Sequence, residues 1–125
     1  MKAAQKARLK LRCPITLARE HQITVPAGWF DLVYQMCAEI EDIAQQINQK
    51  RRQRMFLPRI IFIEEHMGKL TCEVINGNKD ISEVIKKAQM RSVQRCMYCG
   101  DEAHQFRRGG NLVSCCDRHR SQFSL

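Results

Sequence analysis

Apolar residues recur every three to four positions between Trp29 and Ile47, the longest periodic pattern in the chain. This spacing places them on one side of a helix, with acidic residues and glutamines on the other side. The apolar stripe comprises Trp29, Leu32, Val33, Met36, Cys37, Ile40, Ile43, Ala44 and Ile47; the polar side includes Asp31, Glu39, Glu41 and Asp42. We therefore predict a long amphipathic helix that opens at Gly28-Trp29.

Two short segments of β type follow this helix. The first, residues 59–65, contains Ile60-Ile61-Phe62-Ile63, and the second, residues 69–76, alternates apolar and polar side chains. The link between them is short enough for a hairpin, and Gly68 within it can adopt a positive φ. Because a two-stranded sheet is marginal alone, we expect it to pack on the long helix or to pair with strands of a partner.

A second helix is predicted after the turn at residues 76–78. Asp80 and Glu83 have the spacing of a capping box, so Asp80 is the expected N-cap. Apolar or small residues then follow at helical spacing, at Ile81, Val84, Ile85, Ala88 and Ser92.

These elements predict an α+β fold, in which a long amphipathic helix packs on a β-hairpin and a second helix precedes a C-terminal zinc-ribbon or zinc-knuckle lobe. We expect three parts: a basic N-terminal arm with an irregular segment at residues 1–27, a helix–hairpin–helix core at 28–94, and a zinc-binding lobe at 95–125.

Two pairs of metal-binding residue types lie in the C-terminal quarter. Cys96-x-x-Cys99 is followed by Cys116-x-x-His119, and Gly100 directly after the first pair suits a tight turn. Three cysteines and one histidine at this spacing predict one tetrahedral structural Zn²⁺ site with no vacant position. Few apolar residues occur beyond residue 95, so bound zinc is the expected reason that this lobe folds.

Some ligand assignments stay open at this stage. Cys115 is adjacent to Cys116 and is an alternative ligand, and His104 is an alternative to His119. A redox pair at Cys96 and Cys99 is less favoured, because that motif belongs after a strand in a βαβ unit. Two further cysteines, Cys37 and Cys72, lie on apolar faces and are expected in the core, whereas Cys13 has no assignment.

The chain is strongly basic, with 21 Lys and Arg against 13 Asp and Glu, a net charge of +8 and a pI near 9.4. Such a charge favours an anionic partner. Seven cysteines without a secretory signal indicate a reducing, cytoplasmic setting. No apolar stretch approaches the ~18 residues of a membrane span, so no membrane association is expected.

The residue patterns give little support for catalysis. The His-x-Glu motif of zinc deaminases and the His-Glu-x-x-His motif of zincins are both absent. A metal-dependent nuclease of the HNH type is the alternative, and His104 and Asn111 are its only candidate catalytic residues. The first hypothesis is a non-enzymatic interaction protein that binds another protein or nucleic acid. Its expected contact residues are Arg107, Arg108, Arg118 and Arg120.

The ordered motifs resemble a family of small, largely uncharacterised phage and prophage zinc-ribbon proteins. The resemblance covers roughly residues 28–120 and rests on Gly28-Trp29, the hairpin Gly68-x-Leu70, Ser92-x3-Cys96-x-x-Cys99-Gly100 and Cys116-x-x-His119. Glu-Glu-His-Met at residues 64–67 departs from the Lys-Glu-Lys-Phe of the family, and the family's tryptophan before Cys116 is missing. The resemblance implies a bacterial or phage-infected cytoplasm, a host or phage macromolecule as the partner, and a structural zinc, and it implies no known activity.

Overall fold

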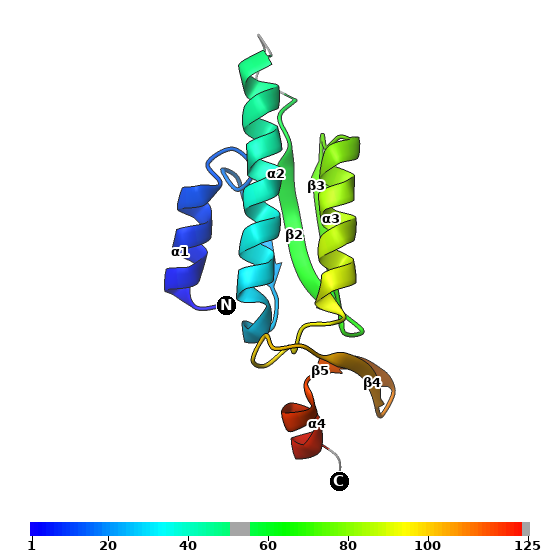
Figure 1. The fold of residues 1–125 in the computed structure, drawn as a ribbon. Coiled ribbons are helices and arrows are strands. Elements are labelled where there is room, and N and C mark those ends of the chain that lie inside the picture. The colour runs from blue at the N-terminus through cyan, green and yellow to red at the C-terminus, as the bar shows by residue number, and fades with distance from the viewer. Residues whose placement is uncertain (51–55, 124–125) are drawn as a thin grey trace.

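The computed structural model describes residues 1–50 and 56–123 and has an α+β fold, which confirms the predicted class (Figure 1). Two helices pack on a three-stranded sheet of order β1-β2-β3, and a smaller lobe with its own hairpin follows at the C-terminal end. The core elements are α1 (Ala3–Arg12), β1 (Gln22–Thr24), α2 (Phe30–Lys50), β2 (Arg59–His66), β3 (Lys69–Ile75) and α3 (Lys79–Ser92). The C-terminal lobe, residues 95–123, holds β4 (His104–Arg108), β5 (Asn111–Cys115) and α4 (Asp117–Phe123).

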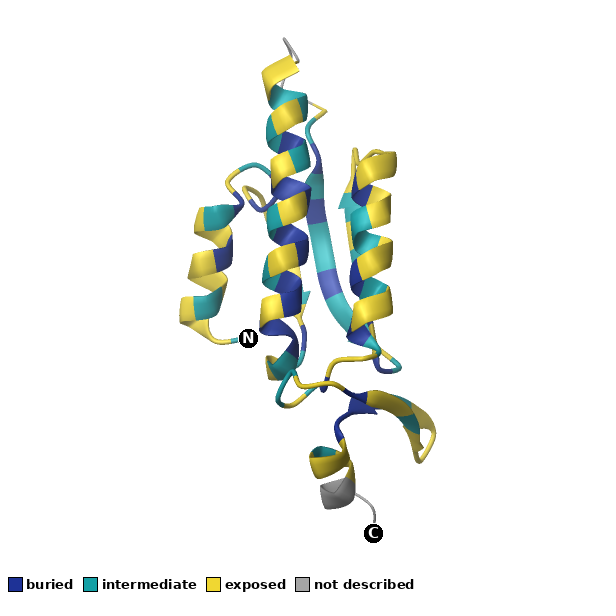
Figure 2. Ribbon diagram, viewed as in Figure 1, coloured by how far each residue is buried: buried dark blue, intermediate teal, exposed yellow. Residues whose placement is uncertain are grey.

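The long helix α2 follows the predicted apolar stripe. Pro26 precedes a 3₁₀ turn, η1 (Ala27–Trp29), from which α2 continues. Buried residues recur along α2 from Phe30 to Ala44 and appear as dark blue segments between exposed ones (Figure 2). No helix within the described residues, α2 included, combines the length and apolarity that spanning a membrane requires.

Glu41 is an exception to the predicted pattern of α2, because it is fully buried and does not lie on the solvent side. Its carboxylate accepts hydrogen bonds from the backbone N–H groups of Ile15 (3.2 Å) and Thr16 (2.9 Å) and from the Thr16 hydroxyl (3.0 Å). The amide of Gln45 donates a further bond of 2.6 Å. A buried carboxylate is stable only with such a set of donors. Glu41 thus fastens the segment after α1 to the middle of α2.

The hairpin forms as predicted, with a two-residue loop. Met67 and Gly68 have φ values of 53° and 78°, the combination that matches the right-handed twist of the flanking strands. β1 supplies a third strand, parallel to β2, with Ile23 opposite Ile63. The expected support for the hairpin therefore comes from within the chain.

The predicted N-cap of α3 was wrong. Asn78 is the N-cap, and its side-chain oxygen accepts the backbone N–H of Ile81 at 2.9 Å, whereas Asp80 lies in the first turn. Asparagine caps a helix as well as aspartate does. Asn78 precedes Asp80 and has the extended backbone of an N-cap residue, so the helix begins after Asn78. Of the residues predicted at helical spacing, Ile81, Ala88 and Ser92 are buried in α3.

Residues 1–27 differ from the expected arm and irregular segment. α1 packs on α2, on the side away from α3, and Leu9, Cys13 and Leu17 are fully buried in the same cluster as Trp29 (Figures 1 and 2). The guanidinium of Arg8 lies over the ring of Tyr34, 5.0 Å from its centroid. The N-terminal residues are thus part of the core.

Candidate metal centre

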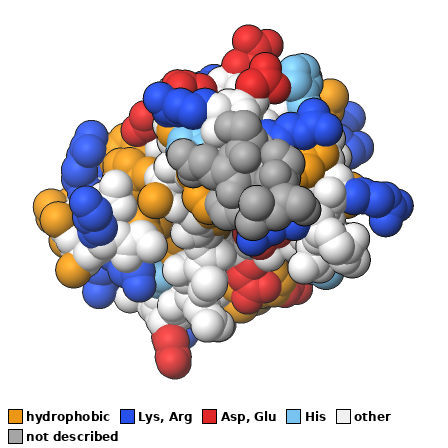
Figure 3. Space-filling view, turned by 90° about the horizontal axis from the view of Figure 1, so that it is seen from below, with side chains coloured by type: hydrophobic (Ala, Val, Ile, Leu, Met, Phe, Trp, Pro, Cys, Tyr) orange, Lys and Arg blue, Asp and Glu red, His pale blue; other side chains and the backbone are white. Residues whose placement is uncertain are grey.

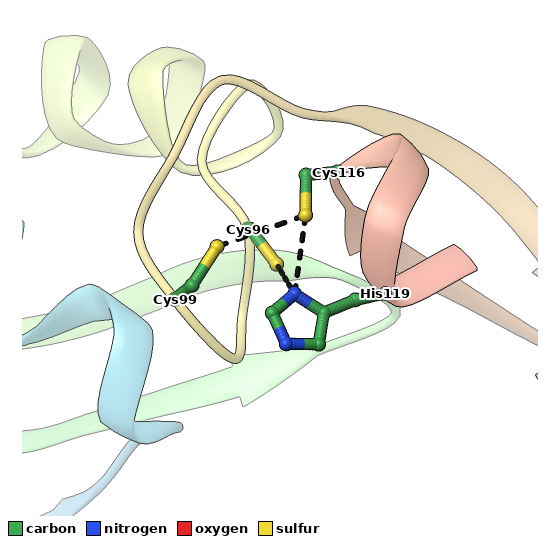
Figure 4. Close-up of side chains that lie close together, drawn as sticks. All are labelled: Cys96, Cys99, Cys116 and His119. Atoms are coloured by element: carbon green, nitrogen blue, oxygen red, sulfur yellow. Dashed lines mark hydrogen bonds between the residues drawn. The ribbon is translucent and has the colours of Figure 1, made fainter. Parts of the chain in front are cut away.

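The four predicted ligand residues come together in one cluster at the junction of the core and the C-terminal lobe. The ligand atoms of Cys96, Cys99, Cys116 and His119 all lie within 4.8 Å of one another (Figure 4). The Cys99 and Cys116 sulfurs are 3.7 Å apart, and Nδ1 of His119 lies 3.5 Å from the Cys96 sulfur and 3.1 Å from that of Cys116. A tetrahedral zinc ion with sulfur at about 2.3 Å and nitrogen at about 2.0 Å needs ligand atoms roughly 3.5–3.8 Å apart. The cluster fits a metal of that size.

The first pair of ligands lies on a tight backbone turn, residues 96–100, called the knuckle below. The N–H of Gly100 donates to the carbonyl of Cys96 at 2.9 Å, and Gly100 has a φ of 80°, as its position suggested. The N–H of Tyr98 points at the Cys96 sulfur, at 3.4 Å. Burial raises the pKa of Cys96, but nearby backbone N–H groups, that of Cys116 first, lower it to about 6. The backbone N–H groups of Cys116 and of the knuckle together stabilise a thiolate, the form that binds metal.

The second pair of ligands joins the end of β5 to the start of α4. Cys116 follows β5 directly, and His119 lies in the first turn of α4, where the three-residue spacing puts both ligands on one side. The imidazole of His119 also stacks on Tyr98, with ring centroids 5.4 Å apart. Both α4 and the knuckle thus orient the histidine so that Nδ1 faces the three sulfurs (Figure 4).

The two alternative ligands lie outside the cluster. Cys115 and His104 are opposite each other in the β4–β5 hairpin, and neither belongs to the group that can hold a metal. The Cys115 side chain is buried, and burial raises its pKa to about 11, so it stays a thiol. The structure therefore separates the adjacent cysteines into one buried thiol and one cluster member.

The C-terminal lobe has a very small apolar core of its own. Its buried members are Cys96, Ala103, Cys115 and Cys116, with Cys99, Phe106 and Val113 packed against them. Ordering each residue costs about 1–2 kcal/mol in backbone entropy, which four small buried side chains do not offset. A metal bound at the cluster would supply what the lobe lacks.

The lobe is held against the core at two places. At the knuckle, Gly28 N–H donates to the carbonyl of Met97 (3.0 Å), and the indole N–H of Trp29 donates to the carbonyl of Arg95 (3.0 Å). At the β2–β3 loop, the hydroxyl of Ser114 donates to the carbonyl of Gly68 (2.6 Å). The motif residues at 28–29, 68 and 96–100 thus meet in one interface.

The four predicted contact arginines lie on the lobe but differ in their surroundings. Arg107 and Arg108 are exposed at the end of β4, beside the Gly109-Gly110 turn. The guanidinium of Arg120 covers the ring of Phe106 at 5.0 Å. Arg118 lies 3.9 Å from the carboxylate of Asp101, and the Cys99 sulfur raises the pKa of its guanidinium.

Seen from the end that carries the lobe, both Lys or Arg and Asp or Glu side chains lie around the edge, with hydrophobic side chains between them (Figure 3). The contacts of Arg120 with Phe106 and of Arg118 with Asp101 could not be predicted from the sequence. Each contact joins two segments that are separate in the sequence and come together only when the lobe folds.

The residues proposed for a nuclease do not form a site. His104 is the first residue of β4 and Asn111 the first of β5, so they lie at opposite ends of the hairpin. Four residues of strand separate the two ends by about 13 Å. The order β4–β5–α4 is the one that such a nuclease uses, but its two side chains do not converge.

Comparison with known proteins adds no family assignment. No family model matches the chain, and neither the curated proteins nor the solved structures contain a match.

Proposed function

We propose that this protein is a non-enzymatic nucleic-acid-binding protein, whose C-terminal lobe is held in shape by one structural Zn²⁺. Cys96, Cys99, Cys116 and His119 supply four protein ligands, which is the complement of a closed zinc site. A closed site leaves no position for a metal-bound water or substrate. Zinc therefore acts here through folding and not as a Lewis acid.

The observation that carries the proposal is the placement of the arginines. Arg107 and Arg108 project from the exposed end of β4, while Arg118 and Arg120 lie on α4, next to the cluster. Zn²⁺ with three thiolates carries one net negative charge, which Arg118 beside Cys99 offsets. Arg107 and Arg108, both exposed on β4, are the proposed principal contacts for phosphate.

Nucleic acid is favoured over protein as the partner because arginine makes paired hydrogen bonds to phosphate and the chain as a whole carries +8. Tyr98 adds an aromatic ring, 42% exposed, on the same lobe. Such contacts give affinity that depends strongly on salt and little on sequence.

Fluorescence anisotropy with labelled single- and double-stranded DNA and RNA, at several salt concentrations, tests this function. Replacing Arg107 and Arg108 with glutamine should weaken binding about tenfold or more and reduce the salt slope by about two. The matched control replaces Lys50 and Lys79 with glutamine, at the end of the molecule opposite the lobe (Figure 1). Equal losses in both double variants, or no binding at low salt, would contradict the proposal.

The same protein preparation also tests the nuclease alternative. Protein incubated with DNA or RNA and Mg²⁺ should leave the substrate intact, and His104→Ala should behave identically. Cleavage that disappears in His104→Ala would support the alternative instead. The phage or prophage setting and the cytoplasmic location stay predictions from the motif resemblance.

A further inference from the structure

The C-terminal end of α3 lies where the core, the knuckle and the β4–β5 hairpin meet (Figure 1). The N–H of Ala103, directly before β4, donates to the carbonyl of Gln94 at 2.8 Å, and Arg95 pairs with Glu102 as an isolated β-bridge. The carbonyl of Arg95 accepts the indole N–H of Trp29 at 3.0 Å. The backbone that follows α3 is thus fixed both to the start of β4 and to the turn that begins α2.

Two arginines at this junction connect three neighbouring surface depressions. Arg91 lines both the depression between α2 and α3 and a second one at the end of α3. Arg95 lines the second depression and a third, which extends to Tyr98 on the knuckle. The three depressions therefore adjoin one another and form a path along the surface, with an arginine at each junction.

The charge of this path changes along α3. Asp80 and Glu83 line it near the start of the helix, whereas Lys87 and Arg91 line it near the end. Arg91 and Arg95 are exposed, and within the described parts of the chain neither takes part in an ion pair. The cationic half of the path is the half that adjoins the C-terminal lobe.

Three carboxylates also line the path, Glu102 in the second depression and Asp31 and Asp101 in the third. Asp101 lies 3.9 Å from the guanidinium of Arg118. Carboxylates repel phosphate but accept hydrogen bonds from the amino groups of bases. A nucleic-acid strand on this path therefore has its phosphates toward the arginines and its bases toward the third depression, where Tyr98 is 42% exposed.

We propose that the partner is single-stranded nucleic acid, which crosses the end of α3 with phosphates on Arg91 and Arg95 and a base against the ring of Tyr98. This inference rests on the proposed nucleic-acid binding and extends that surface from the hairpin onto α3. Arginine makes paired hydrogen bonds to phosphate, and an exposed aromatic ring stacks on a base of a single strand. The bases of a duplex are already stacked and paired, so they do not reach such a ring.

Fluorescence anisotropy with a labelled oligodeoxycytidylate of about twelve nucleotides, at neutral pH and several salt concentrations, tests the inference. This strand should bind more tightly than a duplex of equal length. Replacing Arg91 and Arg95 with glutamine should weaken its binding about tenfold or more. The salt slope should fall by about 1.4, because each phosphate contact of a single strand contributes about 0.7.

The matched control replaces Lys79 and Lys86 with glutamine. Both are exposed on the same helix and line none of the three depressions, so this variant should bind within about twofold of the parent. Should the double arginine variant not fold, Arg91→Gln alone should weaken binding about threefold.

The outcomes separate this inference from the function on which it rests. The inference is overturned, and nucleic-acid binding stands, if the variants at Arg91 and Arg95 bind like the lysine control while replacement of Arg107 and Arg108 weakens binding. A duplex that binds as tightly as the single strand overturns it as well. No binding of either nucleic acid at low salt contradicts the proposed function itself.

Discussion

The backbone N–H of Gly28 donates a hydrogen bond of 3.0 Å to the carbonyl of Met97, so the turn that begins α2 rests directly on the knuckle. The approach is so close that a side chain at residue 28 has no room. A Cβ atom there would lie 2.3 Å from the carbonyl oxygen of Cys96 and 2.8 Å from the nitrogen of Gly100. Both obstacles are backbone atoms, which cannot rotate aside.

Gly28→Ala should therefore destabilise the protein by about 2–3 kcal/mol, as overpacking at a rigid contact does. Urea denaturation of the zinc-loaded protein measures the change. The matched control is Gly110→Ala, because an added Cβ at Gly110 meets nothing within 4 Å. Equal stability of the two variants would mean that the lobe is not seated on α2 as described.

Metal content and folding of the lobe should change together. Elemental analysis should find about one zinc per chain in the parent and in Cys115→Ser, but much less in Cys96→Ser and His119→Asn. Cys115→Ser is the informative control, since that residue neighbours the cluster without belonging to it.

Removal of the metal with a chelator should affect the two parts of the fold unequally. Amides of β4 and β5 should lose their protection from hydrogen exchange, because the lobe has little core of its own. Those of α2 should keep theirs, since sixteen buried residues form the larger core. Unchanged protection in β4 and β5 would contradict a structural role for the metal.

Glu41→Gln should cost about 2–4 kcal/mol of unfolding free energy. The buried carboxylate accepts hydrogen bonds at both oxygens, and an amide would place an NH₂ group against at least one of those donors. Glu39→Gln, at an exposed position of the same helix, should change the stability by less than about 0.5 kcal/mol. Similar values for the two variants in urea denaturation would exclude the proposed role of Glu41.

The stability of the fold should fall in alkaline solution because of Cys13. Burial, with a further contribution from the charge of Glu41, raises the pKa of this fully buried thiol from 9.0 to about 11. Between pH 9 and 11 the unfolded chain releases the Cys13 proton while the folded chain keeps it, so the free energy of unfolding decreases as pH rises.

At pH 10.5 the loss attributable to this thiol should be about 2 kcal/mol relative to pH 8. Other groups also titrate in this range, so the comparison is with Cys13→Ala. The variant should show a smaller decrease between the two pH values, and parallel curves would remove Cys13 as the cause.

Local patterns were sufficient for the elements that are periodic by themselves. The apolar stripe of α2, the hairpin with Gly68 at positive φ, and the two ligand pairs all depend on residues within a few positions of one another. Each pattern has a regular period or a fixed ligand spacing, so it can be recognised without knowing how the rest of the chain folds.

The remaining features depend on contacts between distant segments. β1 is only three residues long, and it is a strand only because it pairs in parallel with β2, with Ile23 opposite Ile63. Glu41 looks like a solvent-side residue until the segment at Ile15 and Thr16 brings its donors.

The two attachment points of the lobe, at Gly28 and at Gly68, lie on separate segments of the core. Two separate attachments restrict the rotation of the lobe relative to the core more than a single attachment would. The hairpin arginines therefore keep a nearly constant orientation relative to α2. For the nucleic-acid binding proposed above, a target would have to match this preset geometry, so curvature and groove width would decide which nucleic acids fit the lobe.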